Sequence, residues 1–135
     1  MQDKVSGVMV SNVRLEHHNE YNELSADVDG EEIWVRVPHD FPLIQRGEIF
    51  VAAALLEAMI RNEPLFIDDN APISPKLLSN LTELQNIYSC WNTDLSVIKI
   101  HANTNTDIVK QEAVGVTSFY SSGIESSHTL STHRN

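Results

Sequence analysis

The residues best suited to chemistry lie near the end of the chain, in a loop of small, hydroxyl-bearing residues at positions 121–126. The loop follows an apolar stretch at 113–120, whose β-branched and aromatic residues predict a buried strand. The residues after the loop predict the opening of a helix, with Ser126 or Ser127 as its N-cap. A strand, a Ser/Gly loop and a helix N-terminus together favour an anion site, because backbone N–H groups and the helix dipole attract negative charge.

The order of residues in this loop resembles the Ser-Gly-Gly-x-Asp-Ser loop of the PP-loop ATP pyrophosphatases, the adenine nucleotide alpha hydrolase superfamily. The similarity is nearest to proteins of the 7-cyano-7-deazaguanine synthase kind. Ser121, Gly123 and Ser126 match the family loop, whereas Ser122 stands in place of its first Gly and Glu125 in place of its Asp. Residues 72–91 look like the leader that precedes the loop in larger bacterial proteins of this kind, so the resemblance covers about the second half of the chain.

The resemblance implies an enzyme that uses ATP and magnesium to adenylate a carbonyl or carboxylate oxygen, releasing pyrophosphate. The nucleotide-binding residues that it implies are Ser121, Ser122, Gly123, Ile124, Glu125 and Ser126. The hydroxyls of Ser121 and Ser126 and the loop amides would hold the pyrophosphate end, and Glu125 would take the place of the family's acidic residue. The catalytic residues stay unknown, and no metal ligand is predicted in this chain.

We therefore expect an N-terminal fragment of such an enzyme, inactive alone, because only the first strand-loop-helix unit of the nucleotide domain is included. The alternative is a small non-catalytic binding or interaction module.

The predicted fold class is α+β: a three-stranded antiparallel meander with two helices, then the first strand-loop-helix unit of an α/β nucleotide-binding domain. Alternating apolar residues predict strands at 7–16, 21–28 and 31–37, and Asp29-Gly30 predicts a hairpin turn between the last two. Helices are predicted at 47–62 and from Ser74, as N-cap before Pro75, to about Trp91. Residues 65–67 suit a short extended piece and 95–101 a strand. The predicted domains are 1–105 and 106–135.

Apolar patterning predicts how these helices are buried. Residues 50–60 are apolar on most sides, with Glu57 the lone charge, so this helix should be buried on several sides or meet a partner chain. Along the second helix an apolar stripe runs from Leu77 to Trp91, and Cys90 beside it is expected to be a buried thiol. The six histidines lack metal-ligand spacing and should lie on the surface.

The charge and the composition limit the kinds of partner that the chain is expected to bind. The formal net charge of −10 argues against binding DNA or RNA phosphates. No apolar run is long enough to span a membrane, no signal peptide is recognisable, and the single cysteine excludes an intrachain disulfide, so the sequence predicts a soluble cytoplasmic protein. A nucleotide remains a candidate ligand. If strand 114–120 kept a free edge, it would favour self-association.

Overall fold

A three-stranded antiparallel meander opens the fold, as the sequence predicts. The computed structural model describes residues 6–106, 121 and 123–132, and nothing outside these ranges is considered below. The meander comprises β1 (Val8–His17), β2 (Tyr21–Val28) and β3 (Glu31–Pro38). Asp29 and Gly30 join the last two strands with φ angles of 50° and 90°, the left-handed backbone that a tight hairpin requires.

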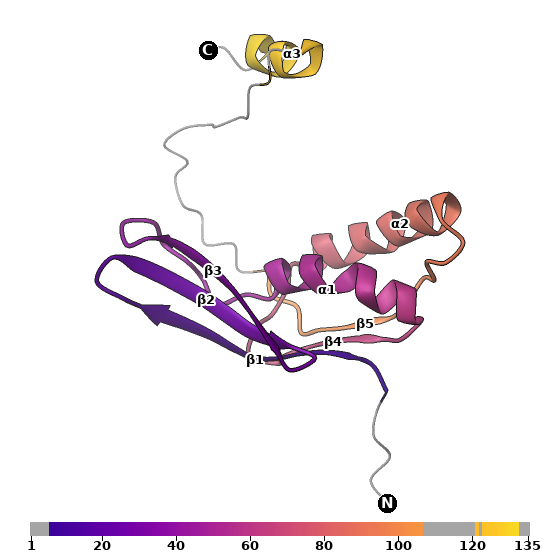
Figure 1. The fold of residues 1–135 in the computed structure, drawn as a ribbon, viewed down its shortest axis with the longest axis horizontal. Coiled ribbons are helices and arrows are strands. Elements are labelled where there is room, and N and C mark those ends of the chain that lie inside the picture. The colour runs from indigo at the N-terminus through magenta and orange to yellow at the C-terminus, as the bar shows by residue number, and fades with distance from the viewer. Residues whose placement is uncertain (1–5, 107–120, 122, 133–135) are drawn as a thin grey trace, which may run out of the picture.

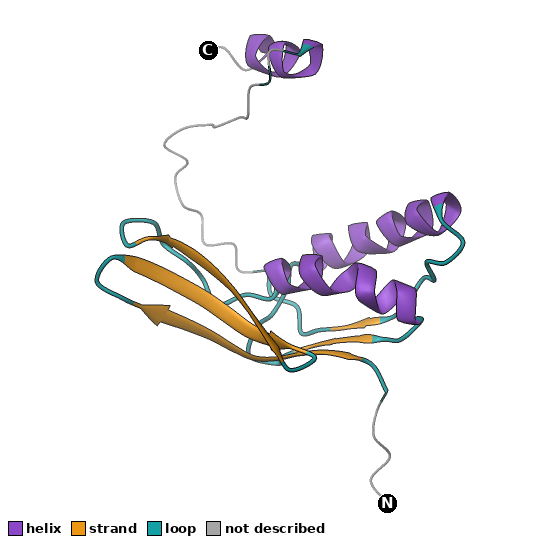
Figure 2. Ribbon diagram, in the orientation of Figure 1, coloured by secondary structure: helices purple, strands orange, loops and turns teal. Residues whose placement is uncertain are grey.

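Two further strands extend the meander into a mixed sheet with the order β3-β2-β1-β4-β5. Strand β4 (Leu65–Ile67) runs parallel to β1, and β5 (Ile100–His101) runs parallel to β4. Parallel neighbours need crossover connections, which α1 (Glu48–Arg61) and α2 (Pro75–Trp91) provide. Both helices lie on the same side of the sheet (Figure 1). Among the described residues the class is therefore α+β, with five strands and a third helix, α3 (Ile124–Thr132) (Figure 2).

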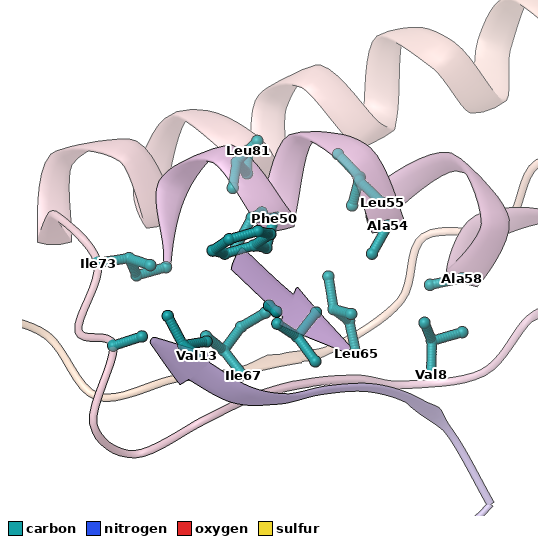
Figure 3. Packing of buried hydrophobic residues seen from close by; sticks show 14 of the residues in the cluster. Val8, Val13, Phe50, Ala54, Leu55, Ala58, Leu65, Ile67, Ile73 and Leu81 are labelled. Atoms are coloured by element: carbon teal, nitrogen blue, oxygen red, sulfur yellow. The ribbon is translucent and has the colours of Figure 1, made fainter. Parts of the chain in front are cut away.

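The hydrophobic core lies between the sheet and the two covering helices. Figure 3 shows Phe50 and Ala58 pointing from α1 toward the strands that carry Val8 and Ile67. Leu81 adds a buried side chain from α2. Gln85 of α2 is one of four buried polar residues in the described chain, and its Oε1 accepts a hydrogen bond from the Ile98 amide at 2.8 Å. Its bond ties the segment before β5 to the helix.

The second helix begins where the sequence predicts. Ser74 has an extended backbone, and its Oγ accepts a 3.4 Å hydrogen bond from the amide of Leu77, with Pro75 at the first helical position. The first helix begins at Glu48 after Gly47, which has no side chain to cap it. Glu48 instead accepts a hydrogen bond from the Ser74 amide at 3.0 Å, so the two helix starts are joined directly.

The predicted strand at 95–101 is wrong over most of its length, because only Ile100–His101 is a strand. The amide of Ser96 donates to the carbonyl of Met59 in α1, and the amide of Ile98 donates to Gln85 in α2. These backbone groups therefore bond to helices rather than to a neighbouring strand. Since the partners are distant in sequence, local apolar patterning does not reveal them.

Three burial predictions also need correction. Cys90 is exposed rather than buried, and Trp91, placed on the apolar stripe of α2, is 79% exposed. Helix α1 is buried on one side only: Ile49, Leu56 and Ile60 are exposed on its outer side. The sheet and α2 cover only the inner side of α1, which explains why its apolar outer side has no cover among the described residues.

An ion-pair network fastens the β2–β3 turn to the end of α1. The carboxylate of Asp29 accepts a hydrogen bond from the Met9 amide at 2.8 Å and pairs with the guanidinium of Arg61, which also pairs with Glu63. The Met9 N–H lowers the pKa of Asp29 most strongly; partial burial opposes this, and Arg61 lowers the pKa further. The network thus fixes the turn against the helix.

A carboxyl group with a lowered pKa stabilises the fold at pH values above its ordinary pKa of 3.8, and the stabilisation is lost as the pH falls through the lower folded pKa. We therefore expect Asp29→Asn to lower the urea midpoint at pH 7, and the gap from wild type to narrow toward pH 3. Asp40→Asn, in the loop after β3, is the matched control. A gap that stayed constant from pH 7 to pH 3 would contradict this assignment.

Candidate functional site

The predicted anion loop lies at the start of α3. This helix begins at Ile124, so the prediction that Ser126 or Ser127 is the N-cap is wrong, and both lie inside the helix. The carbonyl of Gly123 accepts the first intrahelical bond, from the amide of Ser127 at 3.0 Å. With several hydroxyl residues in succession, the sequence offers more than one N-cap, and the backbone uses the earlier start.

Two serine hydroxyls meet at this helix start. The Oγ atoms of Ser121 and Ser126 lie 3.3 Å apart, and the Ser126 hydroxyl donates to the carbonyl of Gly123 at 3.1 Å. The Ser121 Oγ also accepts a bond from the Gly123 amide at 3.4 Å. That bond is long for an N–H···O contact, so the amide can exchange it for a shorter one to a stronger acceptor.

The first turn of α3 supplies further donors. The amides of Ile124, Glu125 and Ser126 precede the first intrahelical bond, so they have no partner within the helix. The positive end of the helix dipole lies beside them. Such donors with two hydroxyls suit an oxyanion such as a phosphate.

Glycine at 123 keeps the loop narrow. A Cβ added there would lie 3.3 Å from the Ser121 Oγ, tighter than most contacts of this kind. Ile124, one residue later, is 90% exposed, and Glu125 is exposed. Of the six predicted residues, hydrogen bonds join Ser121, Gly123 and Ser126, whereas the side chains of Ile124 and Glu125 are exposed. Ser122 and the predicted strand at 114–120 lie outside the described residues.

A second polar cluster, at the carboxyl end of β4, was not anticipated as such. Asp68 accepts bonds from the amides of Val13 at 3.1 Å and Asn70 at 3.2 Å. The side chain of Asn70 returns a bond to the carbonyl of Val13 at 3.1 Å. These bonds satisfy the backbone where the register of β1 shifts, between Ser11 and Arg14, so the cluster is structural.

Metal binding finds no support in the described ranges, where no three His, Cys, Asp or Glu side chains form a group able to hold an ion. His17, His18, His39 and His128 are exposed, as the sequence predicts, whereas His101 is half-buried and its ring stacks on that of Phe66, with the centroids 4.6 Å apart. Within the same ranges, no helix is long and apolar enough to span a bilayer.

Comparison with known proteins found no relative of this chain. Family models, curated proteins and solved structures were each searched with the chain, and none gave a match.

Proposed function

We propose that this chain is the N-terminal part of an ATP-dependent adenylating enzyme of the PP-loop kind, similar to 7-cyano-7-deazaguanine synthase, and that residues 121–126 hold the pyrophosphate end of the nucleotide. The observation that carries the proposal is the pair of Ser121 and Ser126 hydroxyls, 3.3 Å apart, at the N-terminus of α3. Serine hydroxyls, together with helix amides that have no partner within the helix, suit a phosphate oxygen.

The exposure of α3 gives independent support. It has no buried residue, and its apolar side chains Ile124 and Leu130 are exposed. A helix of nine residues is marginal in water without tertiary contacts. An apolar surface of this kind supports the proposal that α3 belongs to a larger nucleotide domain, against which these two side chains pack.

In an adenylation reaction the substrate oxygen attacks the α-phosphorus of ATP and pyrophosphate leaves. Magnesium, when bound, neutralises phosphate charge. The loop amides and hydroxyls hold the leaving group in place, which stabilises charge as it develops on the pyrophosphate oxygens. Glu125 occupies the position of the family's acidic residue. We assign no residue of this chain to activation of the substrate.

The proposal predicts that residues 1–135 bind pyrophosphate weakly, roughly in the millimolar range typical of a few exposed donors, but do not catalyse ATP–pyrophosphate exchange. Titration calorimetry should show binding that is lost in Ser121→Ala/Ser126→Ala. Ser131→Ala, which removes a hydroxyl from the far end of the same helix, is the matched control and should bind as wild type. Restoring the family residues in Ser122→Gly/Glu125→Asp should tighten binding.

Two outcomes would contradict the proposal. Equal binding by wild type and Ser121→Ala/Ser126→Ala would show that the loop is not the site. Robust exchange by residues 1–135 would show that the catalytic machinery lies within this chain.

A second role is supported by a different observation. The outer side of α1 carries apolar residues that neither the sheet nor α2 covers, which favours a binding or interaction module in residues 6–106. This role does not depend on the nucleotide loop, and one chain can serve both.

A further inference from the structure

The outer side of α1 forms a continuous apolar stripe. Ile49, Leu56 and Ile60 are 39%, 46% and 59% exposed, and Ala52 and Ala53 between them are also exposed. Ile49 and Leu56 are each three or four residues from both alanines, and Ile60 follows Leu56 by four, so all five lie on one side of the helix. The opposite side carries the buried residues that face the core. This helix thus has two apolar sides, of which the described chain covers one.

A hollow of about 360 Å³ adjoins the stripe, between α1 and the β2–β3 hairpin. Its apolar lining includes Val8 from β1, Ile33 from β3 and Ala53, which also belongs to the stripe. The apolar stripe and the hollow therefore form one connected surface, since Ala53 belongs to both.

The charges of the hollow are all of one sign. Asp29, Glu31 and Glu57 line it, and no Lys, Arg or His does. Asp29 is paired with Arg61, but neither Glu31 nor Glu57 forms an ion pair with any residue that the structure describes. Both are exposed, and the whole chain carries a formal net charge of −10. A cation placed in the hollow would relieve the repulsion among these carboxylates.

We propose that the stripe and the hollow bind a basic amphipathic segment of a partner protein. Its apolar residues lie on Ile49, Leu56 and Ile60, and a Lys or Arg enters the hollow. The aliphatic stem of such a side chain packs on Ala53 and Ile33 while its charged end reaches Glu31 and Glu57. The proposal rests on the interaction role of residues 6–106 and is independent of the nucleotide loop.

The test uses fluorescence anisotropy with three labelled peptides of equal length. One is an amphipathic helix of Leu and Lys, the second replaces Lys with Glu, and the third replaces Leu with Ser. We expect wild-type residues 1–135 to bind only the first peptide. Because exposed charge pairs contribute modestly, Glu31→Gln/Glu57→Gln should weaken binding roughly fivefold. Leu56→Gln should weaken it by a similar or larger factor.

Matched variants distinguish binding at this surface from a general effect of the net charge and from binding at the loop before α3. Glu20→Gln/Asp40→Asn removes two acids elsewhere, in the loops after β1 and β3, and should leave binding unchanged. Ser121→Ala/Ser126→Ala should also bind as wild type, whether or not it loses pyrophosphate. Thermal melting of each variant establishes that it is folded.

Several results would overturn the proposal. Binding of the Ser/Lys peptide as tightly as the Leu/Lys peptide would indicate general attraction to an acidic chain. Binding of the Leu/Glu peptide that depends on Leu56 would keep the interaction role but refute the basic partner. Failure of every peptide to bind would refute both the interaction role and the basic partner. A wild-type dimer in analytical ultracentrifugation that Leu56→Gln dissociates would assign the stripe to a second copy of this chain.

Discussion

Leu55→Ala should lower the free energy of unfolding by about 2–5 kcal/mol, whereas Leu56→Ala, one residue later in α1, should lower it by less than about 1 kcal/mol. Leu55 is 3% exposed and belongs to the core cluster, while Leu56 is 46% exposed on the outer stripe. Removing Leu55 leaves a cavity that its neighbours fill only in part. Removing Leu56 takes atoms that already contact water.

The two variants can be compared directly because the substitutions are chemically identical and both sites lie in the middle of one helix. The change in helix propensity is therefore the same in both and cancels. Urea unfolding followed by far-UV circular dichroism measures both. Since small domains have only about 5–15 kcal/mol of stability, the Leu55 variant should show a large drop in midpoint. Equal losses in the two variants would mean that α1 is buried on both sides and that the outer stripe is not a surface.

Gly47→Ala should destabilise the domain by about 1–3 kcal/mol through overpacking, with a further penalty because alanine is a poor N-cap. The φ angle of Gly47 is −89°, which any residue can adopt, so backbone strain is not the cause. A Cβ at this position would lie 2.7 Å from the carbonyl oxygen of Ala71 and 2.9 Å from the Cγ2 of Ile67. The start of α1 would have to move away from the segment after β4.

The same urea titration checks this prediction, with Gly123→Ala as the control. Among the residues that the structure describes, a Cβ at Gly123 would meet only the Ser121 hydroxyl, at 3.3 Å, and the site is exposed. That control should change the stability of the domain by less than about 0.5 kcal/mol. If Gly47→Ala were equally neutral, the close approach of α1 to the segment after β4 would be wrong.

Local sequence signals predicted the parts of the fold that depend on neighbours in the chain. Asp29-Gly30 indicated the hairpin turn, and Ser74-Pro75 indicated the start of α2. The parallel pairing of β4 with β1 and β5 was not predicted, because it depends on contacts across long stretches of chain. Likewise, the apolar pattern of α1 could not reveal that only one of its two apolar sides is covered.

The residue types of the candidate loop could be predicted from the sequence, but the residue at which its helix begins could not. Residue types alone indicated that hydroxyls and a glycine precede a helix near the end of the chain. They could not decide the helix start, because Ser126 and Ser127 both suit a cap; the Gly123 carbonyl accepts the first helical bond instead. The hollow beside α1 was missed, since its carboxylates come from Asp29, Glu31 and Glu57, on the β2–β3 hairpin and α1.

We propose that the loop before α3 binds the pyrophosphate end of a nucleotide. The most direct test of this proposal is to titrate pyrophosphate into ¹⁵N-labelled residues 1–135 and follow the backbone amide resonances. We predict saturable shifts at Gly123, Ile124, Glu125 and Ser126, with the amides of the domain core unchanged and with no shifts in Ser121→Ala/Ser126→Ala. Amide shifts that are absent from these four residues, or that persist in the double variant, would contradict the claim.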